Sequence, residues 1–233
     1  MGPGEQMPSE HPIKITREAL NDGTVAKLAA ARDDAQTYVA SEDELLASRR
    51  QLLADDADCS DIWVFGYGSL IFNPVFEHID KCEARIYGRH RRFCLWTRIG
   101  RGTPERPGLV LGLDQGGSCT GLAFRLDPGN AIDELDLLWR REMISMSYQA
   151  RWVTLHTADG IKRAITFVLV PDRPNYAARM PIETEVEIIA SATGFIGHCR
   201  DYLFDTVDGL HQYGLRDPHL EKLAGLVKAR LAL

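Results

Sequence analysis

The chain has 233 residues, 45 % of them hydrophobic and 26 % charged, which suits one ordinary domain or two small ones and excludes a disordered, collagen-like or coiled-coil protein. With 27 basic and 33 acidic residues the formal net charge is −6, so we expect no nucleic-acid partner and no binding to anionic membranes. The five cysteines form no CxxC pair, and the chain shows neither a signal-peptide pattern nor an apolar run of membrane-spanning length, so we expect a protein of the reducing cytoplasm.

We expect residues 1–61 to form a helical N-terminal extension of the main domain. The segment from Ser41 to Glu44 matches a capping box, in which the Ser and Glu side chains bind each other's backbone N–H groups. Leucines follow it at helical spacing: Leu45, Leu46, Leu52 and Leu53.

Residues 62–233 are expected to form one α+β domain. It begins with a buried strand, Ile62 to Phe65. Further strands are expected over Ala84–Phe93, Gly108–Leu113, Thr120–Leu126, Arg151–Thr157 and Arg163–Val170. Hairpin turns are expected at Asp114–Ser118 and at Asp159-Gly160. Helices are expected from Asn130, from Pro181 and from Asp217-Pro218, where proline suits the first helical position. Because hairpins rather than helical crossovers join the strands, this pattern argues against a doubly wound parallel sheet.

Two glycines, Gly66 and Gly68, flank Tyr67 directly after the first strand. Glycine permits backbone angles closed to other residues and leaves N–H groups uncovered, so such a turn can hold a carboxylate or phosphate in a nest of amides. The turn is not a dinucleotide fingerprint, because Ile71 stands at the third glycine position. A tight turn that binds nothing is an equally good interpretation of the spacing alone.

Glu142 is expected on the buried face of a helix over Asn130–Met143. The apolar stripe of that helix is Ile132, Leu135, Leu138 and Trp139, and Glu142 continues it. Burial raises the pKa of a carboxyl and makes it a candidate for proton transfer. Alternatively, Glu142 frays outward at the helix end or pairs with Arg141. Asp136 and Arg140 lie off this face and are expected to form an ordinary surface pair.

An arginine-rich segment follows the first turn: Arg85, Arg89, Arg91, Arg92, Arg98, Arg101 and Arg106. In an acidic protein this segment indicates a solvated rim or a pocket for acidic ligands rather than a nucleic-acid surface.

Several motifs occur in order over most of the chain: Trp63–Ile71, Arg91–Phe93, Arg101–Gly108, Gly121–Leu126, Trp139–Met143 followed by Tyr148, and Asp201–Phe204. Together they resemble the ChaC-type γ-glutamylcyclotransferases, the glutathione-specific branch of that superfamily, and most of all its bacterial members. The resemblance implies a compact mixed β-barrel of the γ-glutamylcyclotransferase-like type with flanking helices and no cofactor. It also implies a lyase that cleaves glutathione, its small-molecule partner, into 5-oxoproline and cysteinylglycine, by attack of the γ-glutamyl α-amine on the γ-amide carbonyl.

The resemblance also assigns roles to individual residues. Glu142 is the expected catalytic acid and base, and Tyr148 and Tyr202 are expected to line the pocket. The γ-glutamyl group is expected to bind the loop residues Gly66, Tyr67, Gly68, Ser69 and Leu70. One departure stands out, because the stricter family motif has arginine where this chain has Leu109. This departure keeps open a cyclotransferase for other γ-glutamyl amines or dipeptides. A separate alternative is a non-catalytic, regulatory module that binds a small molecule in the same pocket.

Overall fold

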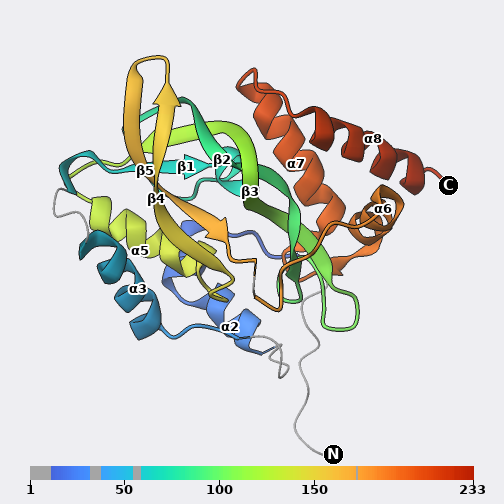
Figure 1. Cartoon of the computed structure of the whole chain (residues 1–233). Coiled ribbons are helices and arrows are strands. Elements are labelled where there is room, and N and C mark those ends of the chain that lie inside the picture. Colours follow the sequence, from blue (N-terminus) through green and yellow to red (C-terminus); the bar gives the residue numbers. More distant parts are fainter. Residues whose placement is uncertain (1–11, 32–37, 55–58, 172) are drawn as a thin grey trace, which may run out of the picture.

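A closed barrel with the strand order β1-β3-β2-β4-β5 forms the centre of the molecule (Figure 1). The computed structural model describes residues 12–31, 38–54, 59–171 and 173–233. The barrel strands are β1 Trp63–Gly66, β2 Asp80–Thr97, β3 Gly108–Arg125, β4 Tyr148–Thr157 and β5 Gly160–Leu169. Strand β1 closes the barrel, because it pairs antiparallel with β3 and parallel with β5. The expected mixed barrel in an α+β fold is therefore confirmed.

The long β2–β3 ladder differs from the expectation. Gly116 and Gly117, with φ of 85° and 70°, lie inside β3 rather than in a turn, and the ladder register shifts between Tyr87 and Arg89 on the facing strand. Residues with positive φ create a bulge, and the pairing resumes on both sides of it. The prediction of two strands joined by a hairpin turn over Asp114–Ser118 is therefore wrong.

The other hairpin and the helices follow the sequence more closely. Strands β4 and β5 form the expected hairpin, with Thr157 opposite Gly160. The main-domain helices are α4 Ser69–Phe72, α5 Ala131–Glu142, α6 Ile182–Ser191, α7 Cys199–Gln212 and α8 Pro218–Leu231. Asp217 caps α8, because its Oδ1 accepts a hydrogen bond from the Leu220 N–H at 3.1 Å. The short elements are the 3-10 turn Cys59–Asp61 and the two-residue strands β6 Thr193–Gly194 and β7 Gly197–His198.

The described part of the N-terminal extension contains the α-helices α1 Arg17–Asn21, α2 Thr24–Ala30 and α3 Glu42–Ala54. The capping box is confirmed, because the Ser41 N–H donates to Glu44 Oε2 at 2.8 Å and the Glu44 N–H donates to Ser41 Oγ at 3.3 Å. Figure 1 shows α2 and α3 beside α5, on the side of the barrel away from α7 and α8.

Helix α5 connects the barrel to this extension. Asp136 pairs with Arg49, and Arg140 pairs with Glu42, so the expected surface pair between Asp136 and Arg140 is wrong. Both side chains point to a neighbouring helix that periodicity alone does not reveal.

The expected apolar stripe of α5 needs one correction. Ile132 is 39 % exposed, whereas Leu135, Leu138 and Trp139 are fully buried. Glu134 is buried instead, because its carboxylate pairs with Arg17 of the extension. Trp139 packs edge-to-face on Phe167 inside the barrel, with ring centroids 5.4 Å apart. The large apolar side chains of α5 thus fix the helix that ends at Glu142. Within the described residues, no helix has the length and apolar character needed to cross a membrane.

Candidate active site

A cavity of about 820 Å³ lies beside the C-terminal end of α5. Its walls come from separate parts of the chain. They are the end of β2 with the residues that follow it (95–100), the end of α5 with the loop to β4 (141–148), the segment Arg173–Asn175, Phe195 with Ile196, and part of the N-terminal extension. This volume falls within the range of roughly 300–1,000 Å³ that is typical of small-molecule sites.

Glu142 lines this cavity as the last residue of α5. Its side chain is 14 % exposed, and its Oε1 lies 3.0 Å from Nε of Arg141. Burial raises the pKa of Glu142, and the Arg141 guanidinium opposes part of this rise. The sequence leaves burial of Glu142 and its pairing with Arg141 as alternatives, and in the structure both occur. A carboxyl with a raised pKa exchanges a proton with a ligand at milder pH than an exposed one.

Arg141 is held in place from its other side. Its side chain is 3 % exposed, and its Nη1 donates a hydrogen bond to the backbone oxygen of Asn73. The Arg141 guanidinium therefore has two partners, the Asn73 backbone oxygen at Nη1 and the Glu142 carboxylate at Nε.

The glycine turn after β1 packs tightly against α7. A Cβ atom on Gly68 would lie only 2.8 Å from the hydroxyl of Tyr202, so a larger residue at this position would have to displace the Tyr202 side chain. The Tyr67 hydroxyl donates to the Phe167 backbone oxygen at 2.8 Å, and Arg91 Nε donates to the Tyr67 backbone oxygen. Within the described chain, the turn residues Gly66–Leu70 are not part of the cavity lining. The structure brings the turn together with Tyr202, next to the cavity rather than on its surface.

Three tyrosines lie close enough to Glu142 to be affected by its charge. Tyr148 lines the cavity, and its hydroxyl donates to the Leu111 backbone oxygen at 2.6 Å. Burial, with the nearby charge of Glu142 as a further contribution, raises the pKa of Tyr67, Tyr148 and Tyr202 above the ordinary value for tyrosine. These hydroxyls remain protonated at neutral pH and can act as hydrogen-bond donors.

Asn175 is a cavity residue that the sequence analysis missed. Its Oδ1 is buried and finds no hydrogen-bond partner among the described residues, while its Nδ2 donates to Ser147 Oγ. Ser147 is in turn hydrogen-bonded to Ser145, with the two hydroxyl oxygens 2.6 Å apart. A buried amide oxygen without a partner is costly, so it is a natural acceptor for a ligand N–H group. Nothing in the sequence pattern indicates it, because these side chains come from loops far apart in the chain.

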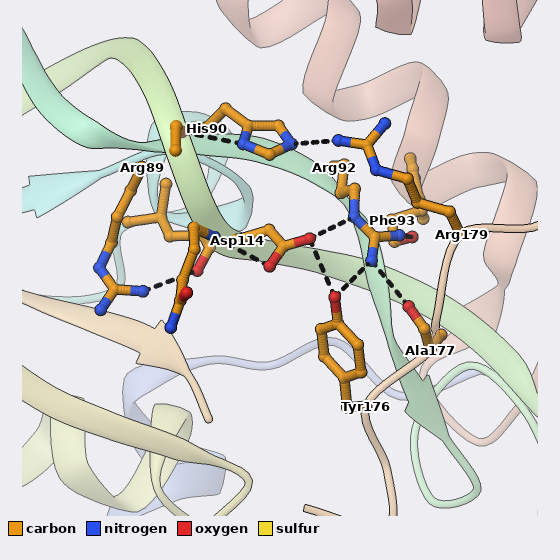
Figure 2. Close-up of polar contacts among 11 residues, drawn as sticks. Arg89, His90, Arg92, Phe93, Asp114, Tyr176, Ala177 and Arg179 are labelled. Atoms are coloured by element: carbon orange, nitrogen blue, oxygen red, sulfur yellow. Dashed lines mark hydrogen bonds and ion pairs between the residues drawn. The ribbon is translucent and has the colours of Figure 1, made fainter. Parts of the chain in front are cut away.

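A buried ionic network fixes the segment that carries Asn175 (Figure 2). Arg92 Nε lies 2.7 Å from Asp114 Oδ2, and Arg92 Nη2 donates to the Tyr176 hydroxyl at 3.0 Å and to the Ala177 backbone oxygen at 2.8 Å. The Tyr176 hydroxyl donates to Asp114 Oδ2 at 3.1 Å. The segment is also hydrogen-bonded to β2, because the Trp96 N–H donates to the Asn175 backbone oxygen at 2.8 Å.

The arginine-rich segment is therefore not a single rim. Arg91 and Arg92 are buried and hold distant parts of the fold together, so the expectation of a solvated rim or ligand pocket is wrong for these two residues. Arg101 is half-buried and stacks on the Tyr202 ring, with its guanidinium carbon 5.2 Å from the ring centroid. Arg98 does line the cavity. Whether an arginine of this segment is structural or lines the cavity depends on where its partners lie in the fold.

Leu109, the position that departs from the family motif, lies in the core. Its side chain is fully buried, and its backbone oxygen accepts a hydrogen bond from the Cys199 thiol at 2.7 Å. In the described structure, the cavity is lined by Val110 but not by Leu109.

The sequence and the fold are both similar to those of known proteins. The family model described as ChaC-like protein matches residues 62–230. The chain is 36 % identical over 219 residues to the glutathione-specific γ-glutamylcyclotransferase of Escherichia coli, and the match covers 94 % of each chain. It is 30 % identical over 188 residues to human glutathione-specific γ-glutamylcyclotransferase 1, covering 78 % of this chain and 85 % of the human protein. A crystal structure of a γ-glutamylcyclotransferase specific to glutathione from yeast has the same fold, with a TM-score of 0.66 at 22 % identity over 73 % of this chain and 96 % of the yeast chain.

Proposed function

This chain belongs to the ChaC-like family, and from that premise we propose that it is a glutathione-specific γ-glutamylcyclotransferase, a lyase that forms 5-oxoproline and cysteinylglycine. The observation that carries the proposal is Glu142, a largely buried carboxyl with a raised pKa in the wall of a cavity large enough for a tripeptide. A binding pocket gains little from burying a carboxyl, whereas proton transfer requires one.

The proposed reaction is intramolecular. The free α-amine of the γ-glutamyl group attacks the γ-amide carbonyl of the same group and closes a five-membered ring. The nucleophile therefore belongs to the substrate, and the enzyme holds the reactive rotamer in place. The bond from the γ-carbon to the cysteine nitrogen then breaks and releases cysteinylglycine. No cofactor takes part in this scheme.

Glu142 is the proposed acid and base. Its carboxylate accepts a proton from the substrate ammonium, which makes the α-amine nucleophilic, and the resulting carboxylic acid then protonates the departing amine. The attacking nitrogen loses a second proton when it becomes the ring N–H, and the released cysteine nitrogen gains a second one when it becomes an ammonium. One group can serve both steps when its pKa lies closer to neutrality than that of an exposed carboxyl. Arg141, 3.0 Å away, limits this rise and keeps the carboxylate form accessible.

The γ-glutamyl group is proposed to bind at the end of the cavity nearest the glycine turn, Tyr148 and Tyr202. The backbone N–H groups of residues 66–70 would anchor the α-carboxylate or stabilise the developing oxyanion. The Tyr202 hydroxyl would add a donor. The Tyr148 hydroxyl, whose proton is donated to the Leu111 backbone oxygen, would line the site as an acceptor. The position of the Tyr202 hydroxyl next to Gly68 and the effect of the Glu142 charge on Tyr67 and Tyr202 support this placement.

The proposal also includes the organisation and location of the protein. Residues 62–233 form the catalytic domain and residues 1–61 an extension of it, which the range of the family match supports. The cytoplasm is the proposed location, since glutathione buffers the thiol pool of that compartment.

The test is incubation of the purified protein with reduced glutathione, followed by measurement of both products. Equal amounts of 5-oxoproline and cysteinylglycine are expected. A folded protein that cleaves γ-glutamyl dipeptides but not glutathione would refute the substrate assignment. A protein whose melting temperature rises with glutathione, while the glutathione stays intact, would refute the enzymatic function in favour of a binding module.

A further inference from the structure

Part of the N-terminal extension forms a wall of the cavity that contains Glu142. The side chains involved are Ile15, Val25, Ala29 and Tyr38. These residues precede the range that the family model matches, residues 62–230. The cavity is therefore completed by a part of the chain that the family match leaves out.

Backbone hydrogen bonds seat the extension at two places on the cavity wall. The Ile13 N–H donates to the Phe195 oxygen at 2.9 Å, and the Ala40 N–H donates to the Ile144 oxygen at 2.8 Å. Phe195 and Ile144 both line the cavity. The ion pairs between the extension and α5 hold the same segment from the outside. The wall is thus a built part of the site and not a loosely attached arm.

A chain of polar contacts connects this wall to the carboxyl. Asn73 Nδ2 donates to the Ile15 backbone oxygen at 3.0 Å. The Asn73 backbone oxygen accepts a hydrogen bond from Arg141, and Arg141 pairs with Glu142 at 3.0 Å. The position of the wall relative to Glu142 is therefore set by direct contacts.

The chemistry of the wall is apolar, unlike that of glutathione. Ile15, Val25 and Ala29 have hydrocarbon side chains, and they share the cavity with Ile144, Phe195 and Ile196. Glutathione has about 20 non-hydrogen atoms and would occupy on the order of 300 Å³, whereas the cavity holds about 820 Å³. The two carboxylates and the ammonium of glutathione gain nothing from a hydrocarbon surface. An apolar group extending from its sulfur atom would gain from it.

We propose that this wall is a subsite for an apolar substituent on the cysteine sulfur, and that the enzyme therefore cleaves S-alkyl glutathiones. The inference rests on the proposed function. The α-amine nitrogen bonds to the γ-carbonyl carbon and the γ-amide C–N bond breaks. The ammonium nitrogen loses two protons when it becomes the ring N–H, and the cysteine nitrogen gains two when it leaves as an ammonium. The sulfur substituent is unchanged and neither water nor a redox partner is consumed. The products are 5-oxoproline and S-alkyl-cysteinylglycine.

The test compares glutathione, S-methylglutathione and S-hexylglutathione as substrates of the full chain. Each fully buried methylene can lower KM by up to about fourfold, so with partial burial we expect a KM for the S-hexyl compound roughly tenfold below that for the S-methyl compound. Ile15→Asn and the nearly isosteric Val25→Thr are each expected to lower the ratio of kcat/KM for S-hexylglutathione to that for glutathione at least about fivefold. Leu53→Asn is the matched control, because Leu53 is a partly buried apolar residue of the same extension outside the cavity lining.

The outcomes separate the two proposals. Cleavage of glutathione without cleavage of S-hexylglutathione overturns the subsite and leaves the proposed function standing. A substrate ratio that is the same in Ile15→Asn, Val25→Thr and the wild type also overturns the subsite. Cleavage of none of the three compounds by the folded protein overturns the proposed function, and the subsite with it. A ratio that falls in the two wall variants but not in Leu53→Asn supports the subsite.

Discussion

The substitution Glu142→Gln removes the group that transfers the proton but keeps the shape of the side chain. The glutamine amide keeps an oxygen in the position that faces Arg141 at 3.0 Å, and Arg141 keeps its hydrogen bond to Asn73. The variant lacks the attraction between the carboxylate and Arg141, which lowers stability, but it also avoids burying a charged carboxylate, which raises stability. Because these effects offset each other, its free energy of unfolding should change by less than about 2 kcal/mol. Loss of a general acid and base should lower kcat by about 10²–10⁴-fold, which raises the barrier by roughly 3–5 kcal/mol.

The assay is release of 5-oxoproline from glutathione at saturating substrate, with melting temperature as the check on folding. Glu185→Gln is the matched control, because Glu185 is another buried glutamate whose pKa is raised by burial, on α6 and outside the cavity lining. We expect the kcat of this variant to stay within about threefold of wild type. This change is far smaller than the one that loss of a general base causes. Glu142 is not the general acid and base if Glu142→Gln keeps more than about a tenth of wild-type kcat, or if both variants lose activity alike.

Three further predictions concern pH, the glycine turn and the buried network. Activity should fall as pH drops through the pKa of Glu142, which burial raises, because the carboxylate is the base; a rate that is flat across this range in a pH profile would contradict the assignment. The raised pKa also means that the folded state binds this proton more tightly, so stability falls as pH rises through it, and Glu142→Gln should gain melting temperature relative to wild type over the same range. Gly68→Ala should raise KM for glutathione at least about tenfold, because its Cβ would meet the Tyr202 hydroxyl at 2.8 Å; an unchanged KM would remove the turn from the site. Arg92→Ala should lower the free energy of unfolding by about 3–5 kcal/mol in denaturant titrations, because it leaves Asp114 buried without its partner; a loss below about 1 kcal/mol would show that water replaces the ion pair.

Much of the fold is predictable because local signals agree with each other. The turn at Gly160, the proline-started helix at Pro218 and the capping box at Ser41 each depend on neighbouring residues only, and all three occur as expected. The burial of Glu142 also follows from helical periodicity, since three buried residues of α5 precede it at helical spacing. Local signals fail at Gly116-Gly117, because a glycine pair is typical of a hairpin turn and of a bulge equally.

The rest of the site depends on contacts between residues far apart in the sequence. Asp217 and Asp114 turn Arg91 and Arg92 into structural ion pairs, and their distance along the chain hides them from any local pattern. The cavity wall formed by the extension is hidden for the same reason. Asn175 has no sequence signal at all, because its position depends on the network around Tyr176.

The central claim is that the γ-amide bond is broken by the α-amine of the substrate and not by water. The most direct test is to incubate the enzyme with glutathione in water enriched in heavy oxygen and to analyse the products by mass spectrometry. Cyclotransfer predicts 5-oxoproline without heavy oxygen, formed in equal amount to cysteinylglycine from the start of the reaction. Glutamate that carries heavy oxygen in its side-chain carboxylate would show hydrolysis and would contradict the account.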